Sequence, residues 1–421
     1  MANLETNFAG IKSPNPFWLA SGPPTNTGYQ VMRAFEAGWG GAVWKTLGEP
    51  IVNVSSRYGA ISYKNNKIMG FNNIELITDR PLEVNIKEMK EVKEKFPNHA
   101  VIASMMFEAK DQWHDCIQRC EDVGVDGFEL NFGCPHGMCE RGMGSAVGQN
   151  PDVCEKITSW VKEKATKPVI VKLTPNITDI TKPALGAQRG GADAASLINT
   201  INSVTGINLN TMNPNPDVNG FSTHGGYCGP AVKPIALNMI SEIYNHPEFK
   251  LPICGIGGIE TWEDAAEHFL MGASTVQVCT AVMHYGFKIA LDLNSGLNNY
   301  LDKHSMKRVT DLTGITAKKI KKWKELDLNY KVIAKIDGNK CIGCQLCYIA
   351  CEDGAHQSIL LKKDSRIPII NEETCVGCNL CSLVCPVEEC ISMVHIKNDK
   401  PKMVWDEHQK NPKNIQITAK V

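Results

Sequence analysis

The feature that most constrains this chain is a cysteine spacing that occurs twice near its C-terminal end. In each run the cysteines are separated by two, two and three residues, and in the second run a proline follows the last of them. The two runs are Cys341, Cys344, Cys347 and Cys351, then Cys375, Cys378, Cys381 and Cys385. Runs with this spacing bind 4Fe–4S clusters, and the fourth thiolate of each run ligates the cluster of the other run.

The spacing therefore predicts two clusters with exchanged fourth ligands. The first cluster takes Cys341, Cys344, Cys347 and Cys385, and the second takes Cys375, Cys378, Cys381 and Cys351. Zinc is the alternative metal, but zinc sites rarely need eight cysteines in this spacing. Cys390 lies outside the pattern, and we interpret it as a buried thiol.

Composition indicates the cellular compartment and the kinds of partner to expect. The 421 residues include 17 cysteines, which would suggest disulfides in an oxidising compartment and metal ligands in a reducing one. The N-terminal residues lack a basic and apolar leader pattern, and no apolar run is long enough to span a membrane, so we expect a soluble cytoplasmic protein. A net charge of −1 gives no reason to expect nucleic acid or a membrane surface as partner.

The first three hundred residues alternate short apolar runs with helical patterns, which favours repeated β-α units around a parallel sheet. Eight strands are predicted, with helices such as 151–164, 233–244 and 262–271 between them. The strands are expected near 17–21, 41–46, 100–105, 127–132, 168–173, 194–199, 252–255 and 275–279. Eight parallel strands favour an α/β fold of the (β/α)8 TIM-barrel type over an open doubly wound sheet.

The rhythm ends before the cysteine runs, so the chain is expected to have two domains. We predict a barrel domain over 1–310, a linker with an exposed helix over 311–335, an α+β ferredoxin-like domain with two 4Fe–4S clusters over 336–400, and a C-terminal tail over 401–421. A lysine-rich stretch at 318–325 marks the linker helix.

Several residues at predicted strand ends are suited to binding an anion. Glycines Gly257 and Gly258 follow the seventh strand, Cys279 and Thr280 follow the eighth, and Gly226 and Gly229 lie in a glycine-rich turn before the seventh. In TIM barrels these loops commonly bind phosphate through backbone N–H groups. Helix–strand packing is an alternative explanation for the glycines.

Two lysines, Lys45 and Lys172, lie at the ends of apolar strands. A buried lysine is costly unless an anionic group pairs with it, so a phosphate or the electron-rich edge of a reduced flavin would explain both. A side chain that reaches solvent at the barrel rim is the alternative.

The fourth strand leads into a glycine-rich loop that carries Cys134. A thiol at a barrel mouth can donate or accept a proton, and the loop can act as a lid. An inert buried cysteine is the alternative. His136 is a rival acid or base, and Cys139 is a weaker one.

At this level of detail the chain resembles the FMN-binding and iron–sulfur portion of dihydropyrimidine dehydrogenases, and it is most similar to the bacterial subunit that carries these two parts. The resemblance runs from about Asn15 to about Cys390. It rests on the motifs Asn15–Phe17, Lys45–Thr46, Asn73–Ile77, Asn131–Gly144, Lys172–Asn176, Ile198–Thr200 and Gly255–Gly258.

The resemblance implies a role for each matching residue. Lys45 and Lys172 contact FMN, and Cys134 is the general acid that protonates C5 of the pyrimidine. The residues that hold the pyrimidine are Asn73, Glu75, Asn131, Asn199 and Thr200. Gly133 departs from the family, which usually has serine there, and this removes one possible hydrogen bond to substrate or thiol.

The resemblance further implies reduction of uracil or thymine, in a reversible reaction, with hydride passing from FMN to C6. Eukaryotic relatives carry FAD and NADPH domains in the same chain, whereas this sequence has no G-x-G-x-x-G after a first strand. NAD(P)H and FAD are therefore expected on a partner flavin and iron–sulfur subunit, around a homodimer of this chain. The alternatives are a dihydroorotate dehydrogenase-like or other cyclic-amide oxidoreductase, and a non-catalytic electron-transfer subunit.

Overall fold

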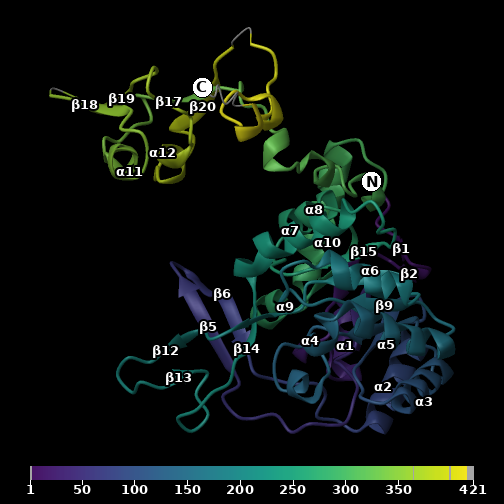
Figure 1. Ribbon diagram of the computed structural model, residues 1–421. Helices are drawn as coiled ribbons and strands as arrows, with labels where there is room; N and C mark the ends of the chain where they lie inside the picture. The colour runs from purple at the N-terminus through teal and green to yellow at the C-terminus, as the bar shows by residue number, and fades with distance from the viewer. Residues whose placement is uncertain (1, 364, 398–399, 415–421) are drawn as a thin grey trace, which may run out of the picture. The chain divides into compact units, whose positions relative to one another are not determined.

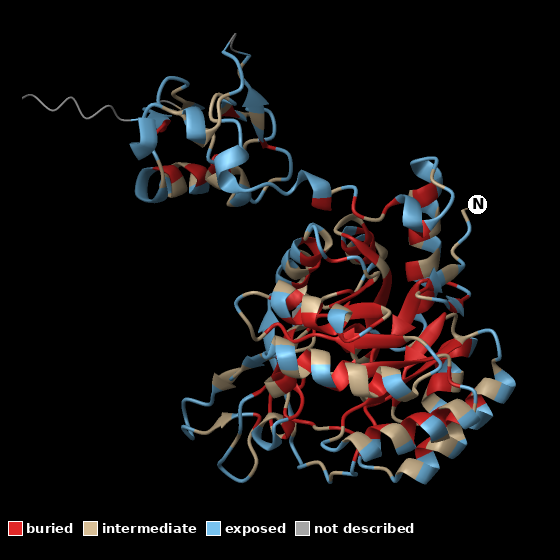
Figure 2. Cartoon of the chain, turned by 45° about the vertical axis from the view of Figure 1, so that its right-hand side comes forward, coloured by how far each residue is buried: buried red, intermediate tan, exposed pale blue. Residues whose placement is uncertain are grey.

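The computed structural model describes residues 2–363, 365–397 and 400–414. The chain divides into two compact units, residues 1–320 and residues 321–421. Buried residues lie inside each unit (Figure 2), and each unit has its own hydrophobic core. The first unit ends ten residues beyond position 310, where the sequence placed the end of the barrel domain.

The first unit is built on a closed barrel of eight parallel strands, which confirms the predicted TIM-barrel fold (Figure 1). Neighbours in the ring are neighbours in the chain, and the last strand pairs with the first. The strands are β3 (Phe17–Leu19), β4 (Gly41–Val43), β7 (Ala100–Met105), β8 (Gly127–Asn131), β9 (Val169–Lys172), β10 (Ala194–Leu197), β15 (Ile253–Ile256) and β16 (Ala273–Val278).

Amphipathic helices surround the barrel and bury their apolar faces against it (Figure 2). Their starts are fixed by local chemistry: the Asn150 side chain accepts the N–H groups of Asp152 and Val153 at the start of α5. The helices are α1 (Gly28–Glu36), α2 (Leu82–Lys95), α3 (Lys110–Asp122), α5 (Pro151–Lys164), α6 (Thr181–Arg189), α7 (Lys233–Tyr244), α8 (Trp262–Leu270) and α10 (Ile289–Lys303).

The hairpin of β1 (Thr6–Phe8) and β2 (Ile11–Ser13) packs Phe8 and Ile11 into one buried cluster with residues of the barrel strands. Side chains alternate along each strand, so Trp18 belongs to this inner cluster while its neighbours on β3 face the helices. The ring of Phe8 packs edge-on against Trp18, with ring centroids 5.7 Å apart.

The barrel interior also holds a buried charge. Glu129 on β8 is fully buried, and its Oε2 accepts hydrogen bonds from Ser196 Oγ (2.9 Å) and Gln277 Nε2 (2.7 Å). Lys172 Nζ at the end of β9 lies 3.6 Å from Glu129 Oε1. The carboxylate is thus the counter-ion of a lysine that is itself almost completely buried.

An antiparallel sheet that the sequence analysis did not predict lies beside the barrel (Figure 1). The segment 225–230, expected to be a turn, forms a strand in its first four residues. An added Cβ at Gly226 would lie 2.2 Å from Thr200 Oγ1, so glycine lets this strand pass close to the barrel rim. In order, the sheet contains β11 (Ile201–Ser203), β14 (Gly225–Cys228), β6 (Asn66–Asn73) and β5 (Tyr58–Tyr63).

The linker does not contain the predicted helix over 318–325. Two single 3-10 turns, Ala317–Lys319 and Trp323–Glu325, are separated by residues in extended conformation. A continuous helix would stack like charges at positions 318, 321 and 322 without burying an apolar face. Residues before 320 instead pack on the barrel unit, where the N–H of Thr316 donates to Leu270.

The second unit repeats one backbone plan around its two cysteine runs. Gly343 and Gly377 both have a φ of 66°, and the residue after the second cysteine of each run is left-handed as well. A helix then follows in each run. Its elements are β17 (Val332–Ile336) paired with β20 (Ile391–His395), β18 (Ile359–Lys362) paired with β19 (Ser365–Ile370), α11 (Leu346–Gly354) and α12 (Leu380–Leu383).

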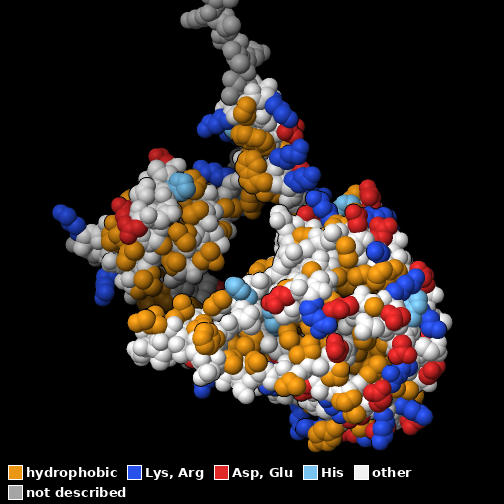
Figure 3. Space-filling view, turned by 60° about the horizontal axis from the view of Figure 1, so that its bottom comes forward, with side chains coloured by type: hydrophobic (Ala, Val, Ile, Leu, Met, Phe, Trp, Pro, Cys, Tyr) orange, Lys and Arg blue, Asp and Glu red, His pale blue; other side chains and the backbone are white. Residues whose placement is uncertain are grey.

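The surface of the barrel unit carries mixed charge. On the face drawn in Figure 3, lysine and arginine side chains are interspersed with aspartate and glutamate. Within the described ranges, no helix combines the length and the apolar character that a membrane span requires.

Removing the buried carboxylate should weaken the barrel strongly. Glu129→Ala leaves Lys172 buried without its counter-ion, so we expect a loss of about 3–5 kcal/mol in unfolding free energy. Urea unfolding, followed through the buried barrel tryptophans, measures the loss. Replacing both partners, Glu129→Met with Lys172→Met, should recover most of it, and an equal loss in the double variant would contradict the ion-pair explanation.

Candidate active site and cluster sites

One cavity lies at the carboxyl ends of the barrel strands. It is lined by every site residue that the sequence predicted in the barrel except Gly226. These lining residues are Lys45, Asn73, Glu75, Asn131, Cys134, Lys172, Asn199, Thr200, Gly229, Gly257, Gly258, Cys279 and Thr280. Gly226 instead stands behind the wall, where its carbonyl oxygen accepts a hydrogen bond from Asn73 Nδ2 at 3.1 Å.

Glu75 is the most heavily bonded side chain of the cavity. Lys45 Nζ binds its Oε1, and its Oε2 accepts Tyr58 OH together with Arg57 Nε at 3.1 Å. Burial alone would raise the pKa of the carboxyl, but the charge and hydrogen bond of Lys45, helped by Tyr58 and Arg57, outweigh it and lower the pKa. Glu75 is therefore ionised.

Tyr58 and Arg57 were missed by the sequence analysis. Tyr58 begins β5 and Arg57 directly precedes it, in a segment without a motif or a β-α rhythm, and no local signal marks them. Burial, followed by the hydrogen bond to Glu75, raises the pKa of the Tyr58 phenol, so it stays a donor. Tyr58 also lines the cavity itself, whereas Arg57 acts on it through the carboxylate.

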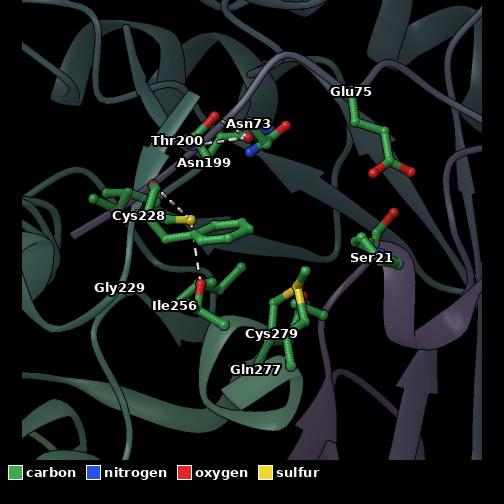
Figure 4. A pocket seen from close by; sticks show the side chains of 18 of the residues that line it. Ser21, Asn73, Glu75, Asn199, Thr200, Cys228, Gly229, Ile256, Gln277 and Cys279 are labelled. Carbon is green, nitrogen blue, oxygen red and sulfur yellow. Dashed lines mark hydrogen bonds between the residues drawn. The ribbon is translucent and has the colours of Figure 1, made fainter. Parts of the chain in front are cut away.

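The amide residues form a connected chain at another side of the cavity. Asn199 Nδ2 donates to Asn131 Oδ1 (2.9 Å), and Asn131 Nδ2 donates to Thr46 Oγ1 (3.0 Å). Figure 4 shows Asn73, Asn199 and Thr200 gathered together, apart from Glu75 and Ser21. The chain joins the ends of β4, β8 and β10 across the mouth of the barrel.

Cys134 is a buried, protonated thiol at the cavity wall. Its Sγ lies 3.5 Å from the carbonyl oxygen of His136, and burial raises its pKa to about 11. His136 also lines the cavity, and its Nε2 bonds the Glu75 carbonyl oxygen at 3.1 Å. Cys139 points to the carbonyl of Pro135 at 3.3 Å and does not line the cavity.

Glycines with left-handed backbone form the opposite wall. Gly257 and Gly258 have φ values of 123° and 74°, and an added Cβ at Gly258 would lie 2.6 Å from the Cβ of Lys233. Side chains are thus excluded where the backbone turns around this end of the cavity. Nearby, Thr280 Oγ1 donates to Cys228 Sγ at 3.2 Å, and Figure 4 shows Cys228 close to Gly229.

In the second unit the cysteines surround two separate cavities. One is lined by Cys341, Cys344, Cys347 and Cys385, together with Cys390, and the other by Cys351, Cys375, Cys378 and Cys381. These are the two sets that the exchanged spacing predicts. Within the described part of the chain, no three of these side chains converge on a point suited to one metal ion. Four thiols around each cavity match the ligand number of a 4Fe–4S cluster.

Comparison with known proteins defines the class. Residues 3–301 match the dihydroorotate dehydrogenase family, and residues 334–393 match the 4Fe–4S dicluster domain. The chain is therefore an oxidoreductase that joins a flavin-binding TIM barrel to an iron–sulfur domain.

Individual relatives narrow the family. The chain is 44% identical over 368 residues, 87% of its length and 89% of the relative's, to the NAD-dependent dihydropyrimidine dehydrogenase subunit PreA of Escherichia coli. It is 43% identical over 326 residues, 74% of its length and 76% of the relative's, to the chloroplastic NADP(+) dihydropyrimidine dehydrogenase of Arabidopsis thaliana. The chain belongs to the dihydropyrimidine dehydrogenase family.

A relative whose name gives another activity has a lower sequence identity to this chain. The catalytic subunit of dihydroorotate dehydrogenase B (NAD(+)) from Pyrococcus abyssi is 36% identical over 319 residues, which are 75% of this chain and 99% of the relative.

The cysteine assignment predicts the iron content. Protein purified without oxygen should carry about eight iron atoms per chain, because two four-iron clusters contain that number. Cys385→Ala should lower the content measurably through loss of the first cluster, whereas Cys390→Ala, at the same cavity but outside the spacing, should leave it unchanged. Iron and zinc analysis measures both, and a module filled with zinc alone would refute the assignment.

Proposed function

We propose that this chain reversibly reduces uracil or thymine to the 5,6-dihydropyrimidine. The observation that carries the proposal is one cavity in which a protonated thiol, three asparagines and an ionised glutamate meet. A pyrimidine ring carries alternating N–H and C=O groups, and amide side chains both donate and accept hydrogen bonds. Membership of the dihydropyrimidine dehydrogenase family supports the same substrate.

The cavity fits FMN as the flavin. Left-handed glycines Gly229, Gly257 and Gly258 provide a backbone cradle from which side chains are excluded, as a phosphate site needs. Lys45 and Lys172, which line the same cavity, would hold the electron-rich edge of the flavin. Bound FMN supplies the hydride that adds to C6 of the pyrimidine.

Cys134 supplies the proton that completes the reaction. As C5 accepts the proton from Sγ, the C5–C6 double bond becomes a single bond, and the thiolate then regains a proton from solvent. A thiol whose pKa is raised to about 11 is fully protonated at neutral pH and so is ready to act as the acid. His136 keeps a neutral ring, since burial lowers its pKa.

The lysines of the cavity favour a neutral ring over orotate as the substrate. The carboxylate of orotate would need a lysine that has no other carboxylate partner. Among the described residues that line the cavity, the lysines are Lys45 and Lys172. Lys45 is bound to Glu75, and Lys172 faces Glu129. Each therefore already has a carboxylate partner.

Electrons are proposed to arrive through the two clusters. Iron–sulfur clusters pass single electrons and cannot accept a hydride, so a flavin must first divide the two-electron donation of NAD(P)H. We place that FAD and the NAD(P)H site on a partner subunit, and the relatives described as subunits support such an assembly. The homodimer at its core stays a prediction.

The test of the function is a donor and substrate panel. The isolated holoprotein should reduce uracil and thymine with a reduced viologen dye, and it should show little turnover with NADH or NADPH alone. Orotate and cytosine complete the panel. Preference for orotate would point to the dihydroorotate activity, and rapid turnover with NAD(P)H by the lone chain would contradict the partner subunit.

The acid is tested by substitution. Cys134→Ala should lower turnover by about 10²–10⁴, the range typical for loss of a general acid, while uracil and flavin binding persist. Cys139→Ala is the matched control, because that thiol lies on the same loop outside the cavity. Steady-state rates with the dye compare them, and equal losses would assign the effect to the loop instead of to one thiol.

A further inference from the structure

Glu129 lies inside the barrel, one layer below the residues that line the cavity. Asn131 on β8 and Lys172 on β9 are register partners, and both line the cavity. Glu129 precedes Asn131 by two residues, so its side chain leaves the same face of β8 one step deeper. It is fully buried and does not line the cavity. Its carboxylate therefore acts on a bound ligand only across the side chains above it.

The carboxylate of Glu129 is held by neutral donors. Its Oε2 accepts hydrogen bonds from Ser196 Oγ at 2.9 Å and from Gln277 Nε2 at 2.7 Å, and these donors come from two other strands, β10 and β16. Its Oε1 has no hydrogen-bond partner among the described residues. Turning the carboxylate toward another partner would break two buried hydrogen bonds, so the barrel itself fixes its position.

Lys172 is paired with this carboxylate by charge and not by a hydrogen bond. Its Nζ lies 3.6 Å from Glu129 Oε1, which is beyond hydrogen-bond length. In the described part of the chain, no group accepts a hydrogen bond from that ammonium. Lys45 differs, because its Nζ binds Glu75 Oε1 directly. The N–H groups of Lys172 are therefore available to a ligand in the cavity.

This geometry lets Glu129 change the charge beside a ligand without using the donors of Lys172. An ammonium group stabilises negative charge that is added to a bound group, and a carboxylate 3.6 Å from the ammonium opposes that effect. Solvent and salt screen buried charges much less than exposed ones, so the opposition is strong. A flavin becomes electron-rich when it is reduced, and its reduction potential responds to both charges.

We propose that Glu129 is a positioning residue that lowers the reduction potential of the bound flavin through Lys172. The inference rests on the proposed flavin site, and it adds a residue that touches neither cofactor nor substrate. A lower potential makes the reduced flavin a stronger hydride donor toward C6 of the pyrimidine. The charge of Glu129 thus favours reduction of the ring, while the N–H groups of Lys172 still hold the flavin.

The first test removes the charge and keeps the shape. In the FMN- and cluster-loaded protein, Glu129→Gln should raise the equilibrium constant for flavin reduction about tenfold, which is ~30 mV for a two-electron couple. Anaerobic titration against a dye of known potential, followed through the flavin absorbance, measures the shift. Glu129→Asp keeps the charge and should stay near the wild-type potential. An unchanged or lower potential in Glu129→Gln would overturn the proposal.

Asp193→Asn is the matched control for a lost negative charge. Asp193 Oδ2 binds Lys162 Nζ at 2.8 Å, and neither residue lines the cavity. The flavin potential of this variant should equal that of the wild type. A rise as large as that in Glu129→Gln would assign the effect to the net charge of the protein and would contradict a specific role of Glu129.

A second comparison decides the question even where Glu129→Gln alone does not fold. Lys172→Gln should lower the flavin potential, because the carboxylate then acts without its cation. Adding Glu129→Gln to that variant leaves neither charge of the pair buried alone, and it should raise the equilibrium constant for reduction about tenfold again. Equal potentials in the single and the double variant would show that Glu129 has only a structural role.

Failure of the proposed function is distinguishable from failure of this inference. If the wild-type protein binds FMN but reduces no pyrimidine, the proposed substrate is wrong, and the potentials still test Glu129. If the wild type reduces uracil and the flavin potentials of Glu129→Gln and wild type are equal, only this inference is wrong. A wild-type chain without affinity for any flavin would overturn both.

Discussion

The carboxylate of Glu75 joins the parts from which the active site is made. Lys45 comes from the end of a barrel strand, Tyr58 and Arg57 come from the added sheet, and all three bind this one side chain. The backbone of the same residue receives His136 from the loop that carries Cys134. Rim, sheet and loop therefore meet at one residue, and their relative positions depend on its charge.

The buried carboxylate of Glu75 is favourable only because its oxygens are paired with cations and hydrogen-bond donors. A buried carboxylate without partners is strongly disfavoured, and the same holds for a buried ammonium group. Here the two lysines of the cavity are each matched to a glutamate, Lys45 to Glu75 and Lys172 to Glu129. The result is a cavity that holds several charges and yet offers a ligand mainly amide groups, a thiol and backbone donors.

The iron–sulfur unit is organised around its cysteine loops. Its cysteine loops need sharp turns between ligands, and left-handed glycines at Gly343 and Gly377 provide them in both runs. Residues that line both cavities belong to one small hydrophobic core, and the predicted exchange of the fourth cysteine would tie the two halves together. A unit of this size with few other buried side chains gains stability from metal binding.

Much of the architecture could be read from local sequence. Eight apolar runs predicted the eight barrel strands, and the helices at 151–164 and 233–244 have the predicted bounds, because period and capping are local properties. The added sheet was missed. β11 and β14 have only three and four residues, and β11, β14 and β6 pair across long stretches of chain, so no local pattern marks this pairing.

The sequence by itself determined the barrel, the division of the cysteines between two cluster sites and the types of residue at the barrel rim, since each of these follows from spacing along the chain. Only the tertiary structure decided how those residues are used. In the folded chain Lys45 forms an ion pair with Glu75, and Cys139 lies outside the cavity. Gly133 makes room for Asn199, where the sequence had suggested only a lost hydrogen bond. The physical reason is that hydrogen-bond direction and steric exclusion arise between groups far apart in sequence, which meet only when the strands close into a ring.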